Sequence, residues 1–139
     1  MARVTFYSSG NTFMMLPGSR AAFMGKIFDE DRQIALLERH RFITFSLAPG
    51  IHVLSSNWWP TTGPAGGTHL TINLVADHHY YISTSFEEVG LGGTKIIMAE
   101  VTCEDAQPGG LTTKPLGIKH LKTDGIAEAI TEKSFPKCE

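Results

Sequence analysis

The fold class is decided by two short apolar runs that meet at a proline–glycine turn. The first run is Arg41-Phe42-Ile43-Thr44-Phe45-Ser46-Leu47, the turn is Ala48-Pro49-Gly50, and the second run is Ile51-His52-Val53-Leu54-Ser55. Both runs are rich in residues typical of strands, and proline and glycine preset turn dihedral angles. A three-residue turn pairs Phe45 with Val53 and places the apolar side chains of both strands on one face. The stretch therefore predicts an antiparallel hairpin.

The same pattern recurs further along the chain, in residues 69–86. Apolar side chains alternate with polar ones on both sides of the turn Asp77-His78-His79. A three-residue turn pairs Leu74 with Ile82, and it places Tyr81 on the outer face of the hairpin. A two-residue turn mixes the two faces. The alternation therefore predicts a second hairpin in the three-residue register.

Further strands are predicted at the start of the chain and around an acidic turn. Residues 3–7 form the first strand, residues 21–28 and 33–37 flank the turn Asp29-Glu30-Asp31-Arg32, and residues 94–103 form the last. A short helix from Asp29 to Arg41 is the alternative for the segment after that turn. Fourteen glycines and seven prolines separate the apolar runs, as in strands joined by turns. We expect an all-β, antiparallel β-sandwich.

The last part of the chain is less regular. The Gln107-Pro108-Gly109-Gly110 stretch marks the end of the strand pattern, so residues 1–106 are predicted to form the β-sandwich domain. Residues 107–139 are then a C-terminal tail that packs on it. Asp124 suits the N-cap of a short helix over Ile126 to Lys133, and an irregular tail is the alternative.

Composition limits the function classes. At 139 residues, 42% apolar and 19% charged, the chain suits one folded domain. The formal net charge of −2 argues against general nucleic-acid binding, which needs a basic face. No apolar run approaches the roughly 20 residues of a spanning helix, and the start of the sequence shows no leader pattern. A cytosolic protein and a mature secreted domain both fit, and no cofactor motif is present.

Residues 2–103 resemble the DUF2846-like domains, small bacterial envelope domains of unknown function. The resemblance is carried by Val4-Thr5-Phe6-Tyr7, by the strand–turn–strand unit of residues 27–37, by residues 45–54 and by Tyr80-Tyr81-Ile82-Ser83. It implies a transthyretin-like or carboxypeptidase-regulatory-like β-sandwich. It also implies an extracytoplasmic location, in the periplasm or cell envelope, where members are often secreted or lipoproteins. A lipid anchor would need a leader and a lipobox cysteine, which this sequence lacks. The family offers no catalytic residues to transfer.

The segment Trp58-Trp59-Pro60 is the most unusual in the sequence. Adjacent tryptophans at the end of a strand point in different directions, so one ring can face the core while the other stays near the loop. Together with Tyr81, they could form an aromatic platform for a carbohydrate or a peptide. The favoured interpretation is that one tryptophan closes the end of the sandwich.

Histidines are the next candidates for chemistry. His78 and His79 lie in a predicted turn beside Asp77, and His69 lies on the neighbouring strand. Imidazole nitrogens at these positions could bind a divalent metal and support a hydrolase. Adjacent turn residues point in different directions, however, so we favour polar turn residues and no metal. His52 is expected to be structural, hydrogen-bonded to a neighbouring strand or loop. No nucleophile motif accompanies these residues.

The two cysteines, Cys103 and Cys138, either form one disulfide or remain thiols. In an oxidising compartment the bridge would tie the end of the last strand to the tail, and we favour that state. The leading functional prediction is a non-enzymatic accessory or interaction domain of the bacterial cell envelope, with an envelope protein or glycan as its partner. A glycan- or peptide-binding module is the alternative, and a metal-dependent hydrolase is less favoured.

Overall fold

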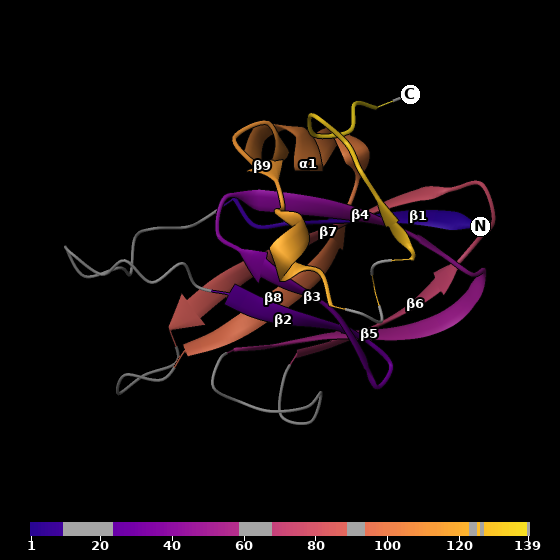
Figure 1. Ribbon diagram of the computed structural model, residues 1–139, viewed down its shortest axis with the longest axis horizontal. Coiled ribbons are helices and arrows are strands. Elements are labelled where there is room, and N and C mark those ends of the chain that lie inside the picture. Colours follow the sequence, from indigo (N-terminus) through magenta and orange to yellow (C-terminus); the bar gives the residue numbers. More distant parts are fainter. Residues whose placement is uncertain (10–23, 59–67, 89–93, 123–124, 126, 139) are drawn as a thin grey trace.

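The computed structural model describes residues 1–9, 24–58, 68–88, 94–122, 125 and 127–138. The strands are β1 (Ala2–Tyr7), β2 (Met24–Asp29), β3 (Arg32–Glu38), β4 (Arg41–Leu47), β5 (Gly50–Trp58), β6 (Thr68–Leu74), β7 (His79–Glu88), β8 (Thr94–Val101), β9 (Lys114–Pro115) and β10 (Ala129–Ile130). One α-helix, α1 (Cys103–Gly110), and a short 3-10 helix, η2 (Ile118–His120), complete the described elements. Figure 1 shows α1 and β9 lying over the layer that contains β1, β4 and β7.

The strands form two sheets that face each other. The six-stranded sheet has the order β10-β4-β1-β7-β8, with β9 also beside β4, and the four-stranded sheet has the order β3-β2-β5-β6. Side chains from both inner faces form one apolar core, among them Val4, Phe6, Phe45, Ile27 and Leu54. The all-β, sandwich-like fold expected from the sequence is confirmed. The six-stranded sheet is mixed, because β1 runs parallel to β7 and antiparallel to β4.

The hairpin around the acidic turn is confirmed. Strands β2 and β3 pair antiparallel, with Ile27 beside Ala35 and Asp29 beside Arg32. The turn is tighter than the predicted four residues, and Glu30 takes a left-handed φ of 56° to close it. The alternative helix from Asp29 to Arg41 is wrong, because β3 and β4 occupy this segment.

The two other predicted hairpins are wrong as pairings. Strand β4 pairs with β1, whereas β5 pairs with β2 and β6, so Phe45 lies beside Val4 and not beside Val53. Likewise β6 and β7 belong to different sheets, and Leu74 is not a partner of Ile82. Both turns therefore connect one sheet to the other. The alternation of apolar and polar residues indicates which face of a strand is buried, but it does not indicate which other strand pairs with it.

The sequence predicts the buried faces of β6 and β7 correctly and the buried face of β5 incorrectly. Leu74 and Ile82 are buried as expected. On β5 the phase is reversed: Leu54 points into the core, while Ile51 is 72% exposed and Val53 is half-buried. Both turns connect the two sheets, but only the turn after β4 reverses the predicted face of the strand that follows it.

The helix lies elsewhere than predicted. Helix α1 begins where the last strand was expected to end, and the Thr102 hydroxyl oxygen caps it by accepting the Asp105 amide hydrogen at 3.1 Å. In the segment predicted to be helical, Ala129–Ile130 is instead a short strand beside β4. Asp124 and Ile126 lie outside the described residues. No described helix is long and apolar enough to cross a membrane.

A second apolar cluster lies on the outer face of the six-stranded sheet. Its members come from β1, β4, β7, α1 and the tail, and they are Tyr7, Phe42, Tyr81, Ala106 and Phe135. Phe135 makes edge-to-face contacts with Tyr7 and Phe42, at ring centroid distances of 5.3 and 5.5 Å. Helix α1 and the tail therefore form a third layer held by aromatic packing.

Candidate interaction surface

Tyr81 does not contribute to the predicted aromatic platform. Tyr81 does lie on the outer face of its sheet, but it is only 3% exposed, because Phe135 packs 5.9 Å from its ring and His79 stacks on it at 4.4 Å. A buried ring cannot stack on a sugar or peptide. Trp59 and the side chain of Trp58 lie outside the described part of the chain.

The candidate histidines are not brought together. His69 is exposed on β6 in the four-stranded sheet, and His78 is exposed in the turn before β7. His79 lies on β7 in the other sheet, with its Nε2 hydrogen-bonded at 2.7 Å to the hydroxyl of Thr5. Among the described residues, no group of three or more His, Cys, Asp or Glu side chains could hold a metal ion. The structure gives His79 a packing role.

Cys103 and Cys138 form a disulfide, with their Cα atoms 5.7 Å apart. Cys103 is the first residue of α1, so the bridge ties the start of the helix to the end of the tail and not to a strand. Gln107 supports the same contact by donating its side-chain amide to the carbonyl of Pro136 at 3.0 Å. The tail is thereby held against the outer face of the six-stranded sheet.

The tail covers the edges of the sandwich on one side. At β4, the Leu116 amide donates to the Phe42 carbonyl at 2.9 Å, and the Ser46 amide donates to the Glu128 carbonyl at 2.7 Å. At β3, the Lys122 amide donates to the Ile34 carbonyl at 3.2 Å. Peptide groups that would otherwise stay unpaired at two strand edges are therefore paired with the tail.

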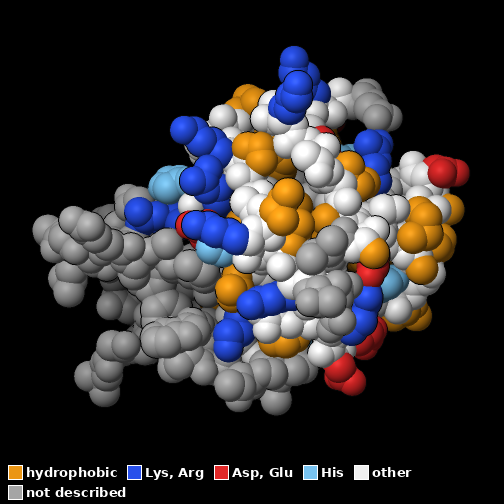
Figure 2. Space-filling model, in the orientation of Figure 1, with side chains coloured by type: hydrophobic (Ala, Val, Ile, Leu, Met, Phe, Trp, Pro, Cys, Tyr) orange, Lys and Arg blue, Asp and Glu red, His pale blue; other side chains and the backbone are white. Residues whose placement is uncertain are grey.

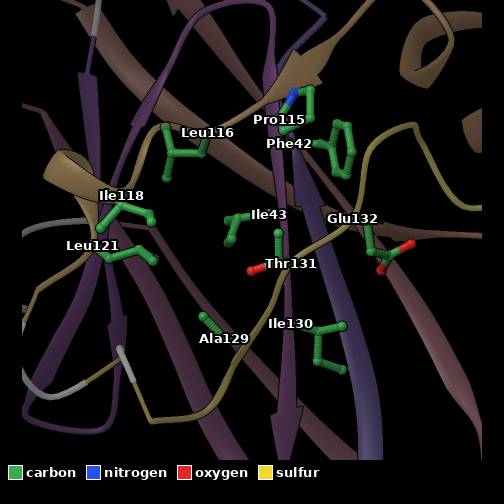
Figure 3. A pocket seen from close by; sticks show the side chains of 10 residues that line it. All are labelled: Phe42, Ile43, Pro115, Leu116, Ile118, Leu121, Ala129, Ile130, Thr131 and Glu132. Carbon is green, nitrogen blue, oxygen red and sulfur yellow. The ribbon is translucent and has the colours of Figure 1, made fainter.

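A small hollow remains where the tail crosses β4 between β9 and β10 (Figure 3). It is lined mainly by apolar side chains from β4, η2 and the tail: Phe42, Ile43, Pro115, Leu116, Ile118, Leu121, Ala129, Ile130, Thr131 and Glu132. Its volume of about 50 Å³ is well below that of ordinary ligand pockets. The hollow is a gap under the tail and too small for a ligand.

On the opposite side of the sandwich, the part of the chain that the structure describes leaves two strand edges unpaired. Among the described residues, β8 pairs with β7 alone and β6 pairs with β5 alone, so each leaves one edge without a strand partner. A hydrogen bond from the Thr68 hydroxyl to the Ile96 carbonyl links the two edges near the start of both strands. Beyond that contact, residues 97–101 of β8 and residues 69–74 of β6 have no strand partner on their outer edges among the described residues.

Strand β8 has the composition of a pairing strand. Ile96 and Met98 are buried against the core, Ile97 and Val101 are half-buried, and Ala99 is exposed. The sequence Thr94-Lys95-Ile96-Ile97-Met98-Ala99-Glu100-Val101 contains neither proline nor glycine, so nothing in it interrupts a ladder. Lys95 and Glu100 are its only charged residues, and charge is a common protection of edge strands. We take this edge as the candidate interaction surface.

Sequence reasoning missed the β8 edge because its position in the sheet depends on the pairing of all the other strands. The local signal is the presence of two charged residues in an otherwise apolar strand. That signal marks an edge strand, but it does not tell which edges the tail will cover.

A network of charged side chains lies at the end of the sandwich where β2 turns into β3. The buried Asp29 accepts hydrogen bonds from His52 Nδ1 at 2.8 Å and from Arg32 Nη2 at 3.0 Å. Arg32 also contacts Glu128 of the tail at 2.5 Å, and this hydrogen bond is the largest of the effects that raise the pKa of Arg32. The network fastens the tail to the turn. It confirms that His52 is structural.

The pKa of His52 is raised. Burial alone would lower it, but the hydrogen bond with Asp29, the carbonyl of Ala48 and the negative charges of Asp29 and Glu30 together outweigh that effect. These contacts favour the protonated ring. When the His52 ring is protonated, the Asp29 carboxylate lies between two positive charges, those of His52 and Arg32.

The chain matches no protein-family model, no curated protein and no solved structure. The resemblance to the DUF2846-like domains, and the location and function that it implies, therefore stay predictions.

Proposed function

We propose that this chain is a non-enzymatic interaction module of the bacterial cell envelope, which binds an extended segment of a partner protein along the edge of β8. The observation that carries the proposal is the contrast between the two sides of the sandwich. The tail covers β3 and β4, while β8 pairs with β7 on one edge and has no strand partner on its other edge among the described residues.

An open strand edge is a template for main-chain hydrogen bonds. From Ile97 to Val101, the peptide groups on the outer edge of β8 offer donors and acceptors to an added strand, and side chains at alternate positions supply selectivity. The exposed Ala99 leaves room for a partner's side chain, and the exposed Glu100 favours a basic residue opposite it. The preferred partner segment is therefore extended, rich in β-branched residues and basic at one position.

The extracytoplasmic location rests on the disulfide. Bridges between cysteines persist in oxidising compartments and are rare in the cytosol. The Cys103–Cys138 bridge connects positions 35 residues apart and holds the tail that covers one side of the sandwich. The resemblance to envelope domains points to the same compartment.

Site-specific photo-cross-linking in the native cell tests the proposal. A photoreactive amino acid replaces Glu100 on β8 in one variant, and it replaces Ile51, which is 72% exposed on the other sheet, in the control. We expect a discrete adduct with one protein at position 100 and none at position 51. Equal cross-linking at both positions, or none at position 100, would overturn the proposal.

A further inference from the structure

A second cavity lies on the closed side of the sandwich, away from the β8 edge. It opens between the turn that joins β3 to β4 and the segment that leads from α1 into β9, and its volume is about 370 Å³. Its lining consists of Glu38, Arg39, His40, Arg41, Thr112 and Lys114. This volume falls within the range of small-molecule sites.

The lining is strongly basic. Arg39, Arg41 and Lys114 are cationic at neutral pH, and the one acidic side chain in the lining, Glu38, accepts a hydrogen bond from His120 Nε2 at 2.6 Å. No ion pair with a carboxylate forms at Arg41 or Lys114 among the described residues. The cavity therefore concentrates positive charge in a protein whose formal net charge is −2.

More basic residues lie in the chain segment next to the cavity. Residues 112–122 contain Lys114, Lys119 and Lys122 and no acidic residue. In Figure 2, many of the Lys and Arg side chains lie over the upper and left parts of the visible face, whereas most Asp and Glu side chains lie at its right and lower right. Such a separation attracts anions to one region of the surface.

The backbone holds the cations close to one another. Arg41 and Lys114 are register partners in the parallel pairing of β4 with β9, where like charges repel. The Lys114 amide donates to the His40 carbonyl at 2.9 Å, and the His40 amide donates to the Ser8 carbonyl at 2.8 Å. His40 has a φ of 64°, a left-handed conformation that is uncommon outside glycine. The fold thus keeps two basic residues next to each other beside a turn, and an anion bound between them would offset their repulsion.

We propose that this cavity binds a phosphate group. Phosphate monoesters carry between one and two negative charges near neutral pH, and guanidinium groups bind phosphate oxygens with paired hydrogen bonds. Arg41 supplies a planar donor, and Lys114 supplies a point charge from the neighbouring strand. The phosphate belongs to a soluble ester or to a lipid headgroup, since both present anionic, non-bridging phosphate oxygens. The site is separate from β8, so it does not depend on the proposed strand pairing.

A titration followed by backbone amide NMR shifts tests the inference. Inorganic phosphate is added to the full chain, and sodium chloride at the same ionic strength serves as the reference because salt alone screens surface charges. We expect saturable shifts centred on His40 and Lys114 with phosphate and not with chloride. A parallel arm uses phosphatidylcholine vesicles with and without phosphatidylglycerol, to distinguish a lipid-borne phosphate from a free one.

Two matched variants distinguish specific binding in the cavity from nonspecific attraction to the positively charged surface. Lys114→Gln removes a cation from the lining, while Lys119→Gln removes an exposed cation of the same patch that does not line the cavity. Lys114→Gln should weaken the binding of phosphate, or of phosphatidylglycerol vesicles, about ten-fold or more, and Lys119→Gln less than about two-fold. Equal weakening by both variants, or the absence of saturable binding to either probe, overturns the inference. Both lysines are exposed, so neither change disturbs the core.

Discussion

His52 Nδ1 lies 2.8 Å from Asp29 Oδ1, and the other ring nitrogen of His52 lies 2.7 Å from the carbonyl oxygen of Ala48. Both of these oxygens are acceptors, so both ring nitrogens must donate, and only the protonated imidazolium can do so. The ring thus joins the turn after β4 to the end of β2. This relationship makes part of the stability of the fold dependent on pH.

The free energy of unfolding should fall as the pH rises above about 6.5, the ordinary pKa of histidine. The folded-state pKa of His52 is raised, so its stabilising contribution is complete below 6.5 and is lost as the pH passes through the folded value. His52→Gln should remove that contribution, about 1–2 kcal/mol on the acidic side. Chemical denaturation across the histidine titration range measures it, with His69→Gln as the exposed control. A His52→Gln variant that keeps the wild-type pH dependence would contradict this assignment.

Loss of the Cys103–Cys138 bridge should destabilise the protein by about 3–4 kcal/mol, because the bridge closes a long loop in the unfolded chain. The double variant Cys103→Ser, Cys138→Ser, compared with the oxidised wild type by chemical denaturation, measures the difference. Thiol titration of the denatured, non-reduced protein provides the control. Two reactive thiols would show that the bridge is absent.

Phe135→Ala should cost about 3–5 kcal/mol, as expected for removal of a buried phenylalanine. Its ring contacts Tyr7, Phe42 and Tyr81, and it leaves no space for a side chain at Gly110, where an added Cβ would lie 2.2 Å from the ring. Leu111→Ala is the control, because Leu111 is 63% exposed beside the same helix and its loss should cost less than about 0.5 kcal/mol. Similar unfolding energies for the two variants would show that the outer aromatic cluster does not hold the tail.

Proline substitutions at two adjacent positions of β8 should have different effects: one should lower the stability of the fold, and the other should weaken partner binding. Successive backbone N–H groups of a strand point to opposite sides, so of Ala99 and Glu100 one donates toward β7 and the other toward the open edge. One variant should therefore lose about 1–3 kcal/mol of stability, through the lost bond to β7. The other should keep its fold and lose the cross-linked adduct at β8, probed from a photoreactive residue at position 97. If both variants keep the adduct, the partner does not pair with this edge.

The sequence predicts individual strands well where a strand and its partner are close neighbours in the chain. The acidic turn after Asp29 allows few arrangements other than a hairpin, and the pairing of Ile27 with Ala35 follows. Alternation also identifies Leu74 and Ile82 as core residues. Both inferences need only local information: turn chemistry and the two-residue period of a strand.

Pairings between distant strands could not be predicted in the same way. The turn Ala48-Pro49-Gly50 is compatible with a hairpin and with a crossing between sheets, and the structure adopts the crossing. The parallel pairing of β1 with β7 joins residues far apart in the sequence, which local patterns do not encode. The burial of Tyr81 depends on Phe135, and the basic cavity depends on the pairing of Arg41 with Lys114. The last two features depend on where the tail lies, because Phe135 and Lys114 both belong to it.

Hydrogen exchange at individual amides of the isolated protein is the most direct test of the open β8 edge. Strand β1 lies between β4 and β7, so its consecutive amides from Val4 to Tyr7 should all exchange slowly. From Ile96 to Val101, slow and fast amides should alternate, since only every second N–H donates to β7. This alternation, measured at a low protein concentration, is the result that we predict. Slow exchange at consecutive positions of β8 would contradict it, because the edge would then already be covered.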